Sequence, residues 1–276
     1  MEEHISQLTH WFNHLFGPIA LRILHALSVQ PADFENPIPE YLVMAIVVLV
    51  IGVLFALMVR ARLSVDRPGG LQQVAEMLLT NPLNFGIRDL LDENIEHGGR
   101  NYIAFVGSIS IFILLSNLLS VIPAFSAPTA IVVVPLACAS LTFLYFNWQG
   151  IRHHGFGRYL MTFAGSPQSG ADYALACLLF PVELISTLAR VLSLTVRLWA
   201  NIFASDMLYV IFLSLLVKLT FFVWGKFAIA GALLALMPLV VPLAFIALHI
   251  FVAIIQAYVF TVLPAIYLGI ATADEH

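Results

Sequence analysis

The feature that most constrains this chain is a pair of long apolar runs, at residues 174–217 and 227–273. Each run holds about 45 residues, and a continuous helix of that length measures roughly 65–70 Å. The hydrocarbon core of a bilayer is only about 30 Å thick. Each run therefore either folds back into two spans or forms one strongly inclined helix. Pro238, Pro242 and Pro264 permit bends but leave both possibilities open.

The composition places the chain in a membrane. Of its 276 residues, 61% are hydrophobic and 10% are charged, and the mean hydropathy is +0.96. So little polar surface cannot coat a soluble domain of this size. None of the apolar runs shows the two-residue alternation of a barrel strand, so we predict an all-α integral membrane protein.

Several classes of function are excluded by charge and cysteine usage. The formal charge of −4 comes without a basic block, which argues against a nucleic-acid partner. Cys138 and Cys177 form neither a disulfide framework nor a metal-spaced cluster. The chain also lacks the sequence motifs of membrane hydrolases and nucleotide-binding enzymes. We expect no metal, no cofactor and no catalytic residue.

The amino-terminal segment, 1–40, is expected outside the membrane. Its apolar residues recur at helical spacing, which predicts an amphipathic helix lying on the surface and broken near Gly17 and Pro18. His10 and His14 stand four residues apart, a spacing that can bind metal. No third ligand is in view, so we expect the two histidines to lie on a solvated face of the helix. The acidic start is not typical of a secretory leader, so we expect no cleavage.

The rest of the chain predicts a single membrane domain with three near-perpendicular spans followed by a hairpin. The segments rich in arginine fall in two loops, and both lie inside if the amino terminus is outside and the carboxyl terminus is cytoplasmic. We predict a first span at 41–59, a cytoplasmic loop with a surface helix at 60–101, the second and third spans within 102–146, a cytoplasmic loop at 147–171 and a tilted hairpin at 172–276.

The polar residues of the two long runs fit one antiparallel register. A turn near residue 227 places Arg197 level with Gln256 and Asp206 level with His249. Two polar pairs at one register would be a coincidence if these residues were scattered independently. The pairs are also chemically compatible, because a cation meets an amide carbonyl and a carboxylate meets an imidazole.

Arg197 stands in the middle of the first run, where a permanent cation costs roughly 3 kcal/mol and therefore indicates function. Asp206, nine residues further, lies on the opposite side of the helix. A purely structural ion pair, or serines that bond to their own helix, remain open as alternatives. Residues spaced by three and four form a polar stripe: Glu183, Ser186, Arg190, Ser193, Arg197 and Asn201.

The stretch "PVELISTLARVLSLTVRLWANIFASDML", followed by "HIFVAIIQAYVFTVL", resembles subunit a of the F-type ATP synthases. The likeness is close over the last hundred residues or so and is one of layout upstream. The resemblance implies a stator subunit, not an enzyme by itself, whose long helices are tilted along a ring of c subunits. Peripheral-stalk b subunits, the rest of the ATP synthase and the lipid bilayer are the other implied partners, in the bacterial cytoplasmic membrane.

The resemblance also implies roles for the polar residues. Arg197 would meet the essential carboxylate of each c subunit, with Gln256 and Asn201 beside it. Asp206 and His249 would line an outer proton half-channel. An inner half-channel would be lined by Glu183 and tuned by Arg190, and Asn117, Ser193 and Ser205 are weaker candidates for the path.

The match is not uniform. Asp206 is shorter than the glutamate found in many relatives, Ala200 and Ser205 replace glycines, and Ser120 stands where some relatives carry an acid. Asn117 either lines a channel or joins two helices. An ion-coupled secondary transporter is the alternative function, although the chain lacks repeated halves with matching interrupted helices.

Overall fold

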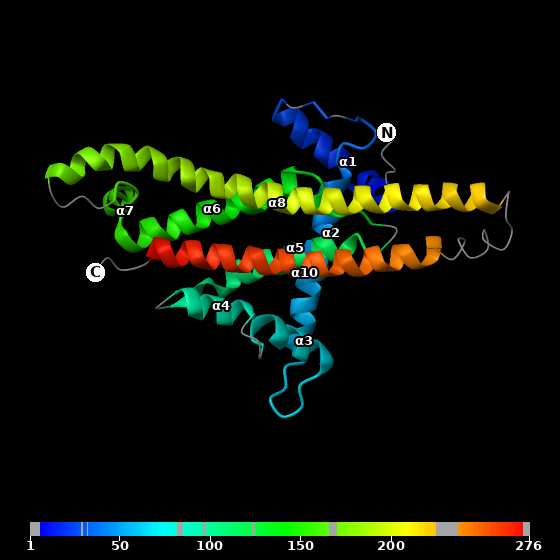
Figure 1. Ribbon diagram of the computed structural model, residues 1–276, viewed down its shortest axis with the longest axis horizontal. Helices are drawn as coiled ribbons and strands as arrows, with labels where there is room; N and C mark the ends of the chain where they lie inside the picture. Colours follow the sequence, from blue (N-terminus) through cyan, green and yellow to red (C-terminus); the bar gives the residue numbers. More distant parts are fainter. Residues whose placement is uncertain are drawn as a thin grey trace.

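The computed structural model describes residues 6–272 apart from 29, 32, 82–84, 96–97, 123–124, 166–169 and 225–236. Within these residues every regular element is helical, which confirms the all-α prediction (Figure 1). In chain order the elements are α1 (Gln7–Ala26), α2 (Glu40–Ala61), α3 (Gly70–Leu79), α4 (Ile87–Asn94), η1 (Gly99–Tyr102), α5 (Ile103–Leu119), η2 (Pro128–Ala130), α6 (Val133–His154), α7 (Phe156–Phe163), α8 (Gly170–Trp224) and α10 (Met237–Thr272).

The two long apolar runs form single helices. Helix α8 is 55 residues long and contains Pro181, and α10 is 36 residues long and contains Pro242 and Pro264. Figure 1 shows the pair side by side and antiparallel, as the hairpin prediction requires. Because α8 alone is about 80 Å long, it fits a bilayer only if it is strongly inclined. The turn predicted near residue 227 lies outside the described residues.

Four helical segments of the described chain are long and apolar enough to cross a membrane: Glu40–Ala61, Gly99–Leu119, Leu175–Val223 and Val241–Thr272. They confirm an integral membrane protein. Helix α6 occupies the position of the predicted third span but is not among the four, and its last turns carry Asn147, Gln149 and Arg152. None of the most apolar part of α8 is buried within the chain, so lipid or another subunit must cover it.

The helices at the positions of the three predicted spans run in different directions. Of these helices, α2 crosses the direction of α8 and α10 in Figure 1. Helix α5 runs antiparallel along α10, because Ser110 bonds to Thr261 at one end of the contact (2.7 Å) and Ser120 bonds to His249 at the other (2.8 Å). Helix α6 packs beside α8. Small hydroxyl side chains allow this close lateral packing of α5.

The core lies where α5, α6, α8 and α10 meet. Leu194, Leu198 and Ile202 of α8 are spaced by four residues and are buried against Ile113 of α5 and Phe260 of α10. This row is adjacent to the predicted polar stripe but does not include it. The core therefore fixes the rotation of α8 about its own axis and leaves the stripe outside.

Helix α1 corrects one prediction. It is continuous from Gln7 to Ala26, with Pro18 inside it, so no break occurs at Gly17 and Pro18. A proline removes one backbone hydrogen bond and disfavours a helix interior. Here the helix is held on the amino-terminal side of Pro18, because Thr9, Asn13 and Gly17 form a buried row there.

Candidate functional site

A buried imidazole joins three helices. His249 of α10 is 8% exposed; its Nδ1 lies 2.9 Å from Ser205 Oγ of α8, and its Nε2 lies 2.8 Å from Ser120 Oγ, which follows α5. Nε2 is also 3.1 Å from the backbone oxygen of Asn117. Both ring nitrogens are therefore engaged by groups that can give or take a proton.

Asn117 extends this cluster toward η2. Thr129 Oγ1 donates to Asn117 Oδ1 at 2.6 Å, and Ser120 Oγ donates to the Asn117 backbone oxygen at 2.9 Å. The Asn117 Nδ2 group is fully buried and has no hydrogen-bond partner among the described residues. Such an orphaned donor is a place where a water molecule would bind.

The second contact between the long helices lies two turns along. Asn201 Nδ2 of α8 donates to Gln256 Oε1 of α10 at 3.3 Å. Gln256 is 1% exposed, and its Nε2 group has no partner among the described residues. The amide is therefore held by α8 and retains an unused donor.

The observed pairs differ by a small step from the predicted ones. Gln256 bonds Asn201, one turn beyond Arg197, and His249 bonds Ser205, the residue before Asp206. Residues at the same level on two helices need not face each other, because each position on a helix is rotated by about 100° from the next. The register was nearly right, but it did not specify which side chain turns inward.

Arg197 points out of the chain. It is exposed, and among the described residues it has neither a salt bridge nor a hydrogen bond. Ser193 and Asn201, on either side of it along the stripe, are exposed as well. Within the described structure, Arg197 therefore does not form the purely structural ion pair that the sequence left open. Its charge is available to a group outside the chain.

Asp206 lies on a different side of α8. It is exposed and makes no hydrogen bond within the described part of the chain, but it is within electrostatic range of His249. A carboxylate and an imidazole in this relation can exchange protons through one intervening water. The structure thus brings Asp206, Ser205 and His249 to one locality.

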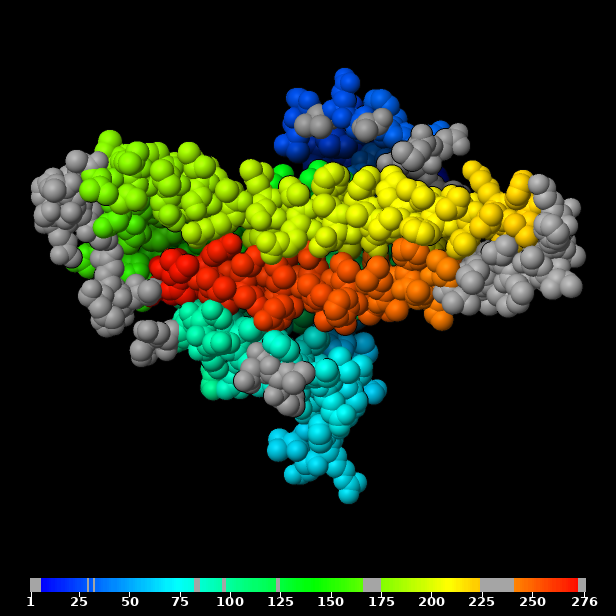
Figure 2. Space-filling view, in the orientation of Figure 1, coloured from blue at the N-terminus to red at the C-terminus, as the bar shows by residue number. Residues whose placement is uncertain are grey.

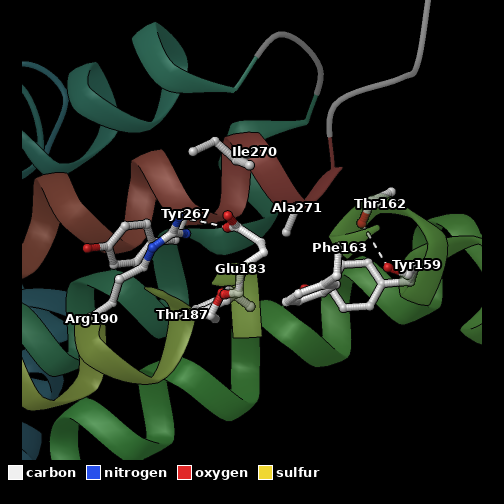
Figure 3. Close-up of a pocket in the computed structure, with 10 residues that line it drawn as sticks. Tyr159, Thr162, Phe163, Glu183, Thr187, Arg190, Tyr267, Ile270 and Ala271 are labelled. Atoms are coloured by element: carbon white, nitrogen blue, oxygen red, sulfur yellow. Dashed lines mark hydrogen bonds and ion pairs between the residues drawn. The ribbon is translucent and has the colours of Figure 1, made fainter. Parts of the chain in front are cut away.

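A second polar cluster lies near the carboxyl-terminal end of α10. Arg190 Nη2 forms an ion pair with Glu183 Oε1 at 3.2 Å, and its guanidinium lies 5.0 Å from the centre of the Tyr267 ring. Figure 3 shows the guanidinium between the ring and the carboxylate. These side chains line a cavity of about 130 Å³. Arg190 and Glu183 therefore form a simple ion pair. The cavity beside this ion pair has room for water.

Helix α7 forms one side of that cavity. Tyr159 lines it, and the tyrosine hydroxyl donates to Asn147 Oδ1 of α6 at 3.0 Å. Burial raises the pKa of Tyr159 to about 12, although the charge of Arg190 acts in the opposite direction. The phenol is therefore neutral under ordinary conditions and acts as a hydrogen-bond donor.

Sequence reasoning missed four residues of these clusters: Ser120 as a partner of His249, Thr129, Tyr159 and Tyr267. A signal existed for two of them. Ser120 is three residues after Asn117, and Tyr267 is eleven residues after Gln256, so each shares a helix face with a candidate. Thr129 and Tyr159 lie in separate elements, and nothing in their local sequence connects them to a site. No three metal-ligand side chains cluster anywhere in the described residues.

Comparison with known proteins gives a consistent result. The family model described as "ATP synthase A chain" matches residues 41–269. ATP synthase subunit a of Solibacter usitatus is 42% identical over 232 residues, which cover 84% of this chain and 85% of that protein. The subunit a of Koribacter versatilis is 38% identical over 273 residues, covering 96% and 98%. That of Campylobacter jejuni is 34% identical over 208 residues, covering 75% and 79%.

These matches include both long helices and the elements before them. They agree with the apolar helices of the structure, with the resemblance of the last hundred residues and with a role in ATP synthesis and proton transport. The chain therefore belongs to the ATP synthase subunit a family and is a multi-pass stator subunit in the membrane sector of that complex.

Proposed function

We propose that this chain carries protons through two half-channels that meet at Arg197, and that it is not itself catalytic. The observation that supports this most is the arginine itself, exposed on an apolar helix and without an ion-pair partner among the described residues. A bare cation in this place is costly unless a partner of opposite charge meets it. A carboxylate on each subunit of a rotating c ring is that partner.

The arginine acts on the ring carboxylate through its charge. The carboxylate crosses lipid only in the neutral form, because a bare charge in hydrocarbon is prohibitive. Beside Arg197 the ionised form becomes the stable one, so the site gives up its proton on arrival and takes another on leaving. The guanidinium cannot be deprotonated in proteins, so it also stops protons from passing directly between the half-channels.

The outer half-channel runs through the His249 cluster. Asp206 admits the proton, and the imidazole, held by Ser205 and Ser120, relays it toward Gln256 and Asn201. The free donors of Asn117 and Gln256 support this route, because they are buried groups ready to order water. The relay favours protons over sodium ions, since imidazole binds a proton and is a poor ligand for a hard cation.

The inner half-channel passes the cavity of Glu183, Arg190 and Tyr267. Glu183 is the proton carrier there. Arg190 favours the ionised form of the Glu183 carboxylate and is positioned by the Tyr267 ring. The amino terminus then lies outside and the carboxyl terminus in the cytoplasm, in the bacterial cytoplasmic membrane, with b subunits of the peripheral stalk holding the chain against the ring.

The two half-channels can be tested by measuring passive proton flux in vesicles that contain the whole complex, with rotation blocked by a rotor–stator cross-link. The wild type should be tight, because the fixed charge separates the channels. Arg197→Ala should leak, whereas Arg197→Lys should leak less, since it keeps a charge. Arg152→Ala, which removes an exposed arginine at the end of α6, serves as the control. Equal tightness of all four complexes would contradict the proposal.

A further inference from the structure

Helix α1 is attached to the chain by one narrow face. The Asn13 side chain clamps one backbone unit, because its Nδ2 donates to the Ile38 oxygen at 3.0 Å and its Oδ1 accepts from the Ile38 nitrogen at 2.9 Å. Thr9 and Gly17, one turn to either side, are buried with it, and Gly17 faces Pro37. Residues spaced by four lie on one side of a helix.

A second face of α1 is mainly apolar and uncovered, with Arg22 as the charged residue within it. Its large side chains fall within an arc of about 160° around the helix, at one side of the clamped row. Trp11 is 64% exposed, and no side chain of this set is below 36%. The set comprises Leu8, Trp11, Leu15, Phe16, Ile19, Ile23 and Leu27.

The third face is polar. His10, His14 and His25 are exposed and lie within about 60° of one another, roughly opposite the middle of the apolar face. The helix therefore separates an apolar surface from a wettable one, as an interfacial helix does. If it were free in water, so much uncovered apolar area would be unfavourable.

The attachment point fixes where α1 lies. Ile38 precedes Pro39, the residue that caps α2, and α2 is itself a candidate membrane span that is mostly not buried within the chain. Figures 1 and 2 show α1 at one end of α2, on the other side of the α8–α10 pair from α3. The clamp thus holds α1 at a membrane boundary, where the apolar surface around α2 is lipid.

We infer that α1 is a lipid-binding helix, which embeds Trp11, Leu15, Ile19 and Ile23 at the boundary of headgroups and acyl chains while its histidine face meets water. A tryptophan suits this position because its ring is amphipathic. The inserted helix adds a lateral anchor at the start of α2 and resists tilting of that span. The interaction surface is the apolar face, and its partner is the outer leaflet.

Spin labels in the intact complex test this inference. The complex is placed in nanodiscs of phosphatidylethanolamine and phosphatidylglycerol, with Cys138 and Cys177 replaced by alanine. Single labels are introduced as Leu15→Cys and Ile19→Cys on the apolar face and His14→Cys on the polar face. Leu54→Cys, on the exposed side of α2, gives the lipid reference. Collision rates with oxygen, which enriches in lipid, are compared with those of a water-soluble nickel chelate.

Labels at 15 and 19 should favour oxygen, as the reference label does, and the label at 14 should favour the nickel chelate. Adding Asn13→Ala should raise the mobility of the label at 19, because the clamp is lost. If the labels at 15 and 19 favour the nickel chelate, the face lies in water and the inference is wrong. If they are shielded from both reagents, a protein covers the face and the inference is equally wrong.

Discussion

Ser205 Oγ lies 2.9 Å from His249 Nδ1, so the imidazole is held by the residue that precedes Asp206 and not by Asp206 itself. The carboxylate remains exposed, while the histidine is fixed between α8 and α5. This arrangement gives the two groups separate tasks. Asp206 can take up a proton from solvent, and His249 can pass it inward without moving.

The first prediction concerns this contact. Ser205→Ala removes one hydrogen bond to the imidazole, which is worth about 1 kcal/mol, and should slow ATP-driven pumping about fivefold. Ser214→Ala is the matched control, since Ser214 is an exposed serine of the same helix whose hydroxyl donates to the backbone oxygen of Ile211. Proton uptake by reconstituted vesicles gives the readout. Equal rates for the two variants would remove Ser205 from the path.

The second prediction concerns Glu183. Glu183→Gln keeps the shape of the side chain but removes the carrier and the ion pair with Arg190. We expect passive proton flux through the membrane sector to fall roughly tenfold or more. Asp92→Asn is the control, because Asp92 also pairs with an arginine, Arg88, at 3.5 Å on an exposed surface. If both variants conduct like the wild type, the cavity is not part of the route.

The third prediction concerns the docking of α7 at high pH. Burial raises the pKa of Tyr159 from 10.0 to about 12, so between these values the phenol ionises in the undocked state but stays neutral in the folded one. The stabilisation is complete below pH 10 and is lost as the pH rises through about 12. Tyrosinate absorbance should include a component that titrates near pH 12, and Tyr159→Phe should remove that component. A wild-type titration identical to that of Tyr159→Phe would contradict the burial argument.

The fourth prediction concerns the glycine beneath that ring. A Cβ built on Gly150 of α6 would collide with the Tyr159 ring, whereas one on Gly157 would meet nothing within 4 Å. Gly150→Ala should therefore displace α7 and lower the stability of the chain by about 1–3 kcal/mol. Gly157→Ala should not. Thermal unfolding of the complex in detergent compares the two, and equal midpoints would disagree with the packing described.

Sequence reasoning was most reliable where length and polarity dominate. The length of the two runs limited them to a folded-back or an inclined arrangement, and the family resemblance favoured the inclined pair. The cost of an intramembrane cation singled out Arg197 without any knowledge of its neighbours. Helix α8 runs unbroken through Pro181, which the sequence analysis did not address.

The side-chain partners and the packing of the helices depend on contacts between distant segments. The antiparallel register brought His249 within one residue of its partner, but the rotation of α8 is set by the buried row of Leu194, Leu198 and Ile202. Spacing along one helix cannot fix that rotation. The directions of α5 and α6 and the approach of Tyr159 to Arg190 are likewise tertiary effects. Local sequence patterns do not predict these directions and contacts.

In the proposed function, the charge of Arg197, which has no ion-pair partner among the described residues, drives the ionisation of the ring carboxylate. The test is ATP-driven proton uptake by vesicles that contain the Arg197→Ala complex, with Ser214→Ala as the control. Uptake by Arg197→Ala should fall to background while the detached catalytic sector still hydrolyses ATP, and the control should pump normally. Normal coupled pumping by Arg197→Ala would contradict the account.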